Sequence, residues 1–141
     1  MRKQIFVNLP VKDLKRTMDF FGRLGFKFNP QFTDQNAACM IIEEDSIYAM
    51  LLVENYFKTF TKKELVDARK STEVLLAISL ESRDKVDEMM KLALDAGGKE
   101  PRDKQDFGWM YNRAIEDLDG HSWEIFYMDM AAFAKAQTQG K

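Results

Sequence analysis

The chain has 141 residues, of which 45% are hydrophobic and 31% charged, and its formal net charge is −2. This length and composition suit one globular domain, or two small halves that share a core. Acidic and basic residues are mixed along the chain without a basic stripe, which disfavours nucleic-acid binding. No apolar run is long enough to cross a bilayer and no cleavage-site pattern follows the N-terminus, so neither a membrane span nor a signal peptide is expected. The single cysteine, Cys39, cannot form an internal disulfide, which favours the cytoplasm.

The first part of the sequence predicts a strand, an amphipathic helix and two further strands. In chain order these are the strand at residues 5–11, the helix between Asp13 and Gly25, and the strands at residues 37–42 and 47–53. Asp13 has the character of a helix N-cap, and Gly25 suits the left-handed position that closes a helix. Leu14, Met18 and Phe21 recur at i, i+4 and i+7, the spacing of one buried helix face.

The same order recurs in the second part. Its segments are the strand at residues 74–80, the helix between Ser82 and Gly97, and the strands at residues 107–115 and 121–128. Five apolar residues on one face indicate the helix: Val86, Met89, Met90, Ala93 and Leu94. Asp117 to Gly120 has the composition of a hairpin turn. The order of predicted elements is therefore repeated, without repetition of the residues themselves, and the period is about half the chain.

A connector at residues 54–72 joins the two parts. Thr61 and Glu64 form a T-x-x-E capping box, which predicts a short helix over residues 61–70. Three aromatic residues precede it, Tyr56, Phe57 and Phe60, and they are expected to pack on a sheet rim or a dimer contact in preference to forming a lid. After residue 129 the tail predicts one short alanine-rich helix that frays over residues 137–141.

Two motifs carry a family resemblance. The opening FVNLPVKDLKRTMDFFGRLGF resembles the first strand and helix of glyoxalase-type proteins, in which Val-x-Asp-Leu is followed by a helix ending Leu-Gly-Phe. The ending IEDLDGHSWEIF resembles their Asp-Pro-Asp-Gly turn and last strand, with Leu118 in place of the proline. Over residues 4–129 the chain is therefore similar to the vicinal oxygen chelate (glyoxalase/bleomycin resistance/extradiol dioxygenase) superfamily, and in particular to lactoylglutathione lyase-like members.

The resemblance implies an α+β fold in which two β-α-β-β-β modules form curved mixed sheets around a cup, with the helices outside. It implies a single domain over residues 1–141. Its parts are module 1 at about 4–53, the connector at 54–72, module 2 at about 73–129 and a C-terminal tail at 130–141. Members of the superfamily commonly pair their modules by domain swap or dimerisation, so a homodimer is expected.

In metal-dependent members of the superfamily, the first and last strands of each module supply four side chains to a divalent cation. The matching positions here are Phe6, Met50, Leu75 and Glu124. Phenylalanine and leucine have no lone pair to offer, and the soft methionine thioether suits copper(I) better than zinc, nickel or iron(II). Glu124 is thus the only retained ligand position. Because the other three positions lack ligand atoms, no cofactor is expected here, and a divalent metal is kept only as a disfavoured alternative.

Glu124 is the only candidate catalytic residue. Because side chains alternate between the two faces along a strand, Glu124 shares the inner sheet face with Ser122 and Phe126. There it would anchor a ligand or act as a base. Two other interpretations remain open, namely a carboxylate hydrogen-bonded to backbone amides or Asn8, and a vestige of an ancestral metal ligand. The only histidine, His121, falls on the opposite parity and is interpreted as an exposed turn residue.

Cys39 and the pair Asp117 and Asp119 have simpler interpretations. Cys39 lies in an apolar strand and is expected to be a small core residue without a nucleophilic role. The two aspartates are expected to serve turn chemistry in preference to acid–base catalysis.

The residues predicted to line the cup are mainly apolar and aromatic. They are Phe6, Asn8, Met50, Leu75, Ala77, Ser79, Glu124 and Phe126, and they are joined by residues whose strand face is less certain: Met40, Tyr48, either Trp109 or Met110, and Tyr111. Such a lining suits a small hydrophobic or aromatic molecule, although the same residues could fill a plain core. The leading hypothesis is a metal-free small-molecule binder of bleomycin-resistance type. The alternatives are a metal-dependent glyoxalase-type lyase or isomerase, and a dimeric scaffold without a ligand.

Overall fold

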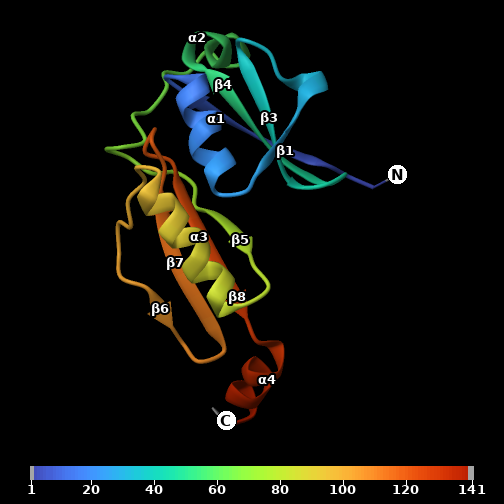
Figure 1. Ribbon diagram of the computed structural model, residues 1–141, viewed down its shortest axis with the longest axis vertical. Coiled ribbons are helices and arrows are strands. Elements are labelled where there is room, and N and C mark those ends of the chain that lie inside the picture. The colour runs from blue at the N-terminus through green and yellow to red at the C-terminus, as the bar shows by residue number, and fades with distance from the viewer. Residues whose placement is uncertain (1, 140–141) are drawn as a thin grey trace. The chain divides into compact units, whose positions relative to one another are not determined.

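The computed structural model describes residues 2–139, and the chain divides into two compact units between Asp67 and Ala68 (Figure 1). We call them the N-terminal and C-terminal modules and describe each by itself. The elements of the N-terminal module are β1 (Ile5–Val11), α1 (Leu14–Arg23), β2 (Lys27–Asn29), η1 (Pro30–Phe32), β3 (Ala37–Glu43), β4 (Ile47–Val53), α2 (Glu54–Phe57) and η2 (Lys58–Phe60). Those of the C-terminal module are β5 (Leu76–Ser79), α3 (Arg83–Asp95), β6 (Gln105–Asp106), β7 (Met110–Glu116), β8 (Ser122–Met128) and α4 (Met130–Gln139).

Each module contains one four-stranded mixed sheet. The strand orders are β1-β4-β3-β2 and β5-β8-β7-β6, so the second sheet repeats the topology of the first. In each sheet the first strand pairs in parallel with the last, and the other pairings are antiparallel. The predicted α+β class with two repeated modules is therefore confirmed. The prediction that both modules form a single domain stays a prediction.

Helix α1 covers one face of the N-terminal sheet. The Asp13 carboxylate accepts the backbone N–H of Arg16 at 3.2 Å, so the predicted N-cap is in place. The buried helix residues are Leu14, Thr17, Phe20 and Phe21, and Met18 is only half-buried, so the buried face is rotated slightly from the predicted one. Burial of a phenylalanine such as Phe20, which is 1% exposed, stabilises the module by roughly 2–3 kcal/mol.

Helix α3 covers one face of the C-terminal sheet in the same way, lying across β7 and β8. The Ser82 hydroxyl accepts the N–H of Lys85 at 3.1 Å, as its predicted capping role requires. Val86, Met90 and Ala93 form the fully buried stripe. Leu94 was predicted to belong to this face but is 45% exposed, because it lies at the edge of the stripe.

Three expectations about irregular segments need correction. The predicted helix over residues 61–70 is wrong, because the Thr61 hydroxyl accepts the N–H of Lys63 in a tight turn and no helix follows. The helical part of the connector is instead α2 with η2, directly after β4. The tail does form the predicted helix, but α4 stays helical to Gln139 where fraying was expected from residue 137, and residues 140–141 lie outside the described chain.

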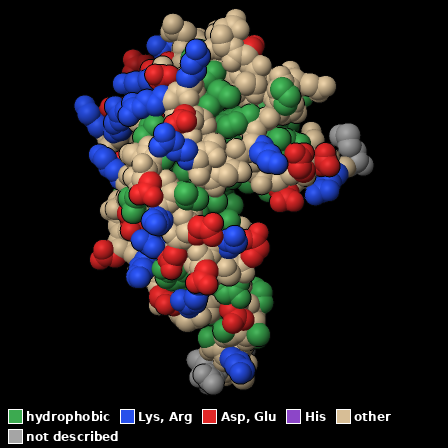
Figure 2. Space-filling view, in the orientation of Figure 1, with side chains coloured by type: hydrophobic (Ala, Val, Ile, Leu, Met, Phe, Trp, Pro, Cys, Tyr) green, Lys and Arg blue, Asp and Glu red, His purple; other side chains and the backbone are tan. Residues whose placement is uncertain are grey.

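No helix within residues 2–139 is long and apolar enough to cross a membrane. Acidic and basic side chains are both present on the faces of the two modules seen in Figure 2, with apolar side chains between them.

Candidate functional site

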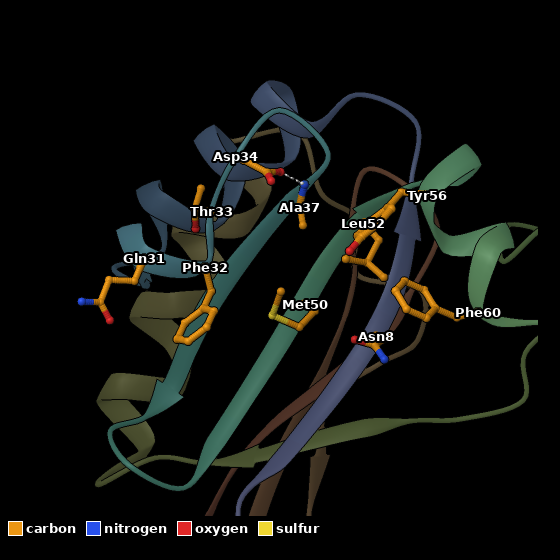
Figure 3. Close-up of a pocket in the computed structure, with 10 residues that line it drawn as sticks. All are labelled: Asn8, Gln31, Phe32, Thr33, Asp34, Ala37, Met50, Leu52, Tyr56 and Phe60. Carbon is orange, nitrogen blue, oxygen red and sulfur yellow. Dashed lines mark hydrogen bonds between the residues drawn. The ribbon is translucent and has the colours of Figure 1, made fainter.

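The sheet face that α1 leaves uncovered holds a pocket of about 330 Å³ (Figure 3). Strands β1, β3 and β4, the loop around η1, and the α2–η2 turn all contribute to its walls. Its lining residues are Asn8, Gln31, Phe32, Thr33, Asp34, Ala37, Met50, Leu52, Tyr56 and Phe60. All of them belong to the N-terminal module. The pocket is therefore complete within one module.

The floor of this pocket comes from one row of the strand pairing. Asn8 on β1 pairs with Met50 on β4, and Met50 pairs with Cys39 on β3. Alternation along the strands turns these side chains away from α1, while Leu9 and Leu51 point beneath the helix and are buried. Two predicted site residues, Asn8 and Met50, are thus brought together.

Two aromatic side chains stand on opposite sides of Met50 (Figure 3). Phe32 is 62% exposed and Phe60 is 63% exposed, so both present ring surface to solvent. Phe60 also meets the ring of Tyr56 edge to face, with 5.1 Å between their centroids. The pocket therefore has aromatic walls that no other side chain covers fully.

The loop that carries Phe32 is fixed by short polar side chains. The Asn29 side chain accepts the N–H of Gln31 at 2.9 Å, and Pro30 occupies the first turn of η1. Thr33 donates its hydroxyl proton to the Asn29 carbonyl at 2.8 Å and accepts the N–H of Cys39 at 3.1 Å. These bonds tie the loop to the start of β3 and hold Phe32 at the pocket wall.

Two polar groups of the pocket keep hydrogen-bonding capacity that the described residues do not use. The Asn8 side chain is exposed and makes no hydrogen bond within the described part of the N-terminal module. One oxygen of Asp34 accepts the N–H groups of Asn36 and Ala37, at 2.8 and 3.1 Å, which leaves its other oxygen available. Gln31 points away from the other lining residues (Figure 3).

A second group of predicted residues lies on the helix-free face of the C-terminal sheet. Ala77 pairs with Glu124, and Ser79 pairs with Phe126. Trp123 and Ile125, on the opposite parity, are buried on the side of α3. Glu124 and Phe126 are half-buried, as their predicted inner-face position requires.

Glu124 is hydrogen-bonded within its own module. Arg102 Nη2 donates to Glu124 Oε2 at 3.1 Å and to Asn112 Oδ1 at 2.6 Å. Asn112 Nδ2 donates in turn to Glu124 Oε1 at 3.3 Å. The carboxylate is therefore paired with a guanidinium, a partner that neither the backbone-amide nor the Asn8 interpretation included.

Several residues of the predicted lining occupy other positions. Leu75 precedes β5 and is 59% exposed. Trp109 precedes β7, and its ring packs against Phe107 and Phe133. Of the residues of uncertain parity, Met40 and Tyr111 belong to the helix-covered faces, since Met40 is fully buried and the Tyr111 hydroxyl donates to Asp87 on α3.

The remaining predicted positions follow from the strand pairing. Phe6 lies on the face of Asn8 but outside the pocket lining, and its ring stacks on Tyr48 with 4.7 Å between centroids. Met110 pairs with Met128 and shares the parity of Asn112 on the helix-free face. Whether the predicted residues bind a ligand stays a prediction.

The chemistry-bearing residues outside the pocket have structural positions. Cys39 is 1% exposed, and this burial raises the pKa of its thiol, so the unreactive neutral form is favoured. Asp117 accepts the backbone N–H groups of Asp119 and His121 and the indole N–H of Trp123, which is turn chemistry. Burial raises the pKa of Asp117 although the nearby His121 and these three donors act in the opposite direction.

The side chains present do not fit a divalent metal. Within residues 2–139 no three His, Cys, Asp or Glu side chains are grouped closely enough to hold one. Three of the four positions matched to the superfamily's ligands are apolar, and Glu124 is paired with Arg102. A divalent-metal site needs several N or O ligands whose charge is not already neutralised by a neighbouring cation.

Sequence reasoning missed the aromatic walls and the partner of Glu124. Phe32 follows Pro30 in a polar loop, a pattern that indicates an exposed aromatic side chain but not what it lines. Arg102 lies in a stretch without apolar periodicity, and the pairings of Lys99 with Glu116 and of β6 with β7 lay that stretch beside β7.

Comparison with known proteins places the fold. Residues 3–43 match the family model described as "Bleomycin resistance protein-like N-terminal". No curated protein matches the chain by sequence.

Solved structures are similar over most of the chain. A hypothetical protein from S. aureus has a TM-score of 0.75 and 23% identity, covering 90% of this chain and 94% of its own. A glyoxalase-related enzyme from Fulvimarina pelagi has a TM-score of 0.74 and 19% identity, covering 90% and 88%. A glyoxalase/bleomycin resistance protein/dioxygenase family enzyme from Burkholderia phytofirmans PsJN has a TM-score of 0.71 and 13% identity, covering 87% and 96%. At these identities the likeness concerns the fold.

Proposed function

The chain has the fold of the vicinal oxygen chelate superfamily, as its motifs predicted, and on this premise we propose that it binds a small, mostly apolar molecule with an aromatic ring, without a metal. The observation that carries the proposal is the pocket of the N-terminal module, with Phe32 and Phe60 on either side of Met50. Pockets that hold small ligands are mostly apolar concave sites with a few polar groups.

The pocket chemistry selects for an aromatic ligand. Phenylalanine rings attract other rings in stacked or edge-to-face contacts, and a methionine sulfur packs well against a ring edge. The exposed faces of Phe32 and Phe60 lose water when such a ring enters, which is the main favourable term for binding.

The polar groups of the pocket set the orientation of the ligand. The Asn8 amide offers both a donor and an acceptor, so it would bind a hydroxyl, carbonyl or ring nitrogen at the ligand edge. The other oxygen of Asp34, which the Ala37 N–H does not use, would accept a hydrogen bond from the ligand. Because the pocket holds few such groups, they give specificity while the rings give affinity.

The two alternative functions have less support. A metal-dependent lyase or isomerase needs several N or O ligands, whereas the matched positions retain one carboxylate, and that carboxylate is paired with Arg102. A scaffold without a ligand does not account for the arrangement of three strands, a fixed loop and a turn around one pocket.

The first experiment follows the methyl group of Met50 by NMR in protein labelled at its methionine methyls. The probe is 1-naphthol, which has two fused rings and one hydroxyl. We expect a saturable shift of the Met50 methyl signal, assigned with Met50→Leu. Phe60→Ala should weaken binding by about tenfold, because one aromatic contact is lost.

A matched control is Phe107→Ala in the C-terminal module. The exposed fraction of Phe107, 54%, is similar to the 63% of Phe60, but Phe107 does not line the pocket. We expect its substitution to leave the affinity for 1-naphthol unchanged. If neither 1-naphthol nor a panel of one- and two-ring aromatics shifts the Met50 methyl saturably, the pocket does not bind such ligands and the proposal fails.

We also propose that the protein works in the cytoplasm as a homodimer. One buried cysteine suits a reducing compartment. Ile5, Phe6 and Ile47 leave an exposed apolar area at the start of β1 and β4, which a second copy could cover. Sedimentation at several concentrations should give the mass of a dimer, and Ile5→Glu should shift it towards the monomer. A monomer at every concentration would contradict the homodimer.

A further inference from the structure

Arg102 is held against the helix-free face of the C-terminal sheet by residues on two neighbouring strands. Its Nη2 group donates to Asn112 on β7 and to Glu124 on β8, at 2.6 and 3.1 Å. Its Nη1 group donates to the backbone carbonyl of Asp103 at 3.2 Å. Three acceptors therefore fix the plane of the guanidinium.

The acceptors are themselves fixed. Asn112 is only 5% exposed, and its Nδ2 group donates to the other oxygen of Glu124 at 3.3 Å. Asn112 thus bonds to both members of the ion pair. The orientation of Arg102 is set by the sheet, so little side-chain entropy is lost if a further partner binds.

The guanidinium has donors left over. An arginine carries five N–H groups and no acceptor. Within the described part of the C-terminal module, three of these groups have acceptors, which leaves the Nε–H and the second Nη1–H of Arg102. The side chain is 31% exposed, so these donors can be reached from solvent.

Glu124 stands at the position that the resemblance assigns to a metal ligand, and here the cation beside it is Arg102. The guanidinium of Arg102 lies 3.1 Å from the Glu124 carboxylate and already compensates its charge, so it would repel a second cation that approached this carboxylate. A positive charge with spare N–H groups binds an anionic oxygen through charge-assisted hydrogen bonds, which are stronger than neutral ones.

We propose that Arg102 is a binding site for a carboxylate group of a small molecule, with Glu124 and Asn112 as positioning residues that orient the guanidinium. The side chain thereby supplies the positive charge that a divalent cation supplies in metal-dependent members. Glu124 offsets part of that charge, so the affinity of wild-type protein for a simple carboxylate is modest. The site depends on no property of the pocket in the N-terminal module.

The test titrates sodium benzoate into 15N-labelled protein at constant ionic strength and follows the Nε–H signal of Arg102 by NMR. We expect a saturable shift with a Kd on the order of millimolar, in line with a ligand of this size. Benzamide has the same shape without the charge, and it should bind at least about tenfold more weakly. A Glu124→Gln variant removes the competing negative charge and should bind benzoate several-fold more tightly.

Two arginine variants complete the test. Arg102→Lys keeps the charge but loses the Nε–H and the planar fork, so benzoate should bind at least about fivefold more weakly. The matched control is Arg83→Gln, because Arg83 is also paired with a carboxylate of this module, Asp106 at 2.8 Å, but it makes no contact with Glu124. That variant should bind benzoate as the wild type does.

The wild-type titration can by itself overturn the proposal. A shift of the Arg102 signal that never saturates, or an equal response to benzoate and benzamide, would show that no carboxylate site exists there. Binding that Arg102→Lys leaves intact would place the anion elsewhere. A Glu124→Gln variant that binds benzoate no more tightly than the wild type would contradict the competition between Glu124 and the ligand carboxylate. The pocket is read at Met50 with 1-naphthol, so its failure and the failure of this site are separate results.

Discussion

Replacing Asp117 by asparagine tests how the β7–β8 hairpin is held together. The carboxylate is buried, with 6% of the residue exposed. Oδ1 accepts the backbone N–H groups of Asp119 and His121 at 3.0 and 2.9 Å, and Oδ2 accepts the indole N–H of Trp123 at 2.9 Å. Asparagine keeps the shape of the side chain but turns one acceptor oxygen into an NH₂ donor.

The expected magnitude follows from which bond is lost. The least costly orientation keeps the amide oxygen on the two backbone N–H groups and places the NH₂ against the indole N–H of Trp123. The indole N–H then faces a second donor, the new NH₂ group, and losing its acceptor costs about 1–3 kcal/mol. We expect Asp117→Asn to lower the free energy of unfolding of the C-terminal module by about 2 kcal/mol. Asp117→Ala removes both acceptor oxygens and all three hydrogen bonds, so it should cost more.

The assay is urea unfolding followed by far-UV circular dichroism in a double-mutant cycle with Trp123→Phe. Phenylalanine has no N–H to satisfy, so Asp117→Asn should cost about 1–2 kcal/mol less in that background. An equal cost of Asp117→Asn in both backgrounds would refute the reasoning, because the bond to the indole would then not limit stability.

Three further predictions concern stability. Gly120→Ala should lower the melting temperature more than Gly25→Ala. Both glycines have positive φ, but a Cβ at Gly120 would lie 2.6 Å from the Arg69 backbone nitrogen, whereas a Cβ at Gly25 would meet nothing within 4 Å. Equal melting temperatures of the two variants would contradict this. Met90→Ala, at a site with 0% exposure, should cost about 2–5 kcal/mol in urea unfolding, whereas Met130→Ala, at 62% exposure, should cost almost nothing. Hydrogen bonds from Arg113 lower the pKa of Glu100 below its usual 4.5. The stability that Glu100 contributes is therefore present above pH 4.5 and is lost as the pH falls through the folded-state pKa. Glu100→Gln should flatten the acid side of the plot of unfolding free energy against pH, and an unchanged plot would argue against the Arg113–Glu100 pair.

The regular elements could be predicted because their signals are local. Asp13 and Ser82 each cap a helix through an N–H three residues away, a contact that needs no distant residue. The strands at residues 5–11 and 47–53 were predicted with the bounds that β1 and β4 have, since turn residues bracket an apolar run. The prediction of a connector helix was wrong because the Thr61 hydroxyl accepts the N–H two residues ahead, where a helix N-cap would accept the one three residues ahead, and no apolar helix face follows.

The candidate site depended on contacts that sequence spacing does not encode. The parity of Glu124 placed it correctly on the helix-free face, but its partner Arg102 lies 22 residues away in a polar loop. Leu75 had the right parity as well, yet the strand begins one residue later, at Leu76. Phe60 lines the pocket only because α2 and η2 turn the chain back after β4.

The repeated sheet topology also bears on how the chain folds as it is synthesised. Every strand pairing of the first sheet closes within residues 5–53, and every pairing of the second lies within residues 76–128. The parallel partner of β1 is β4, so the ribosome must complete β4 before the first sheet can close, but it need not have begun the second. We therefore expect the first half to gain protease resistance while the second is still being translated, which shortens the time for which unpaired strand edges are exposed to aggregation.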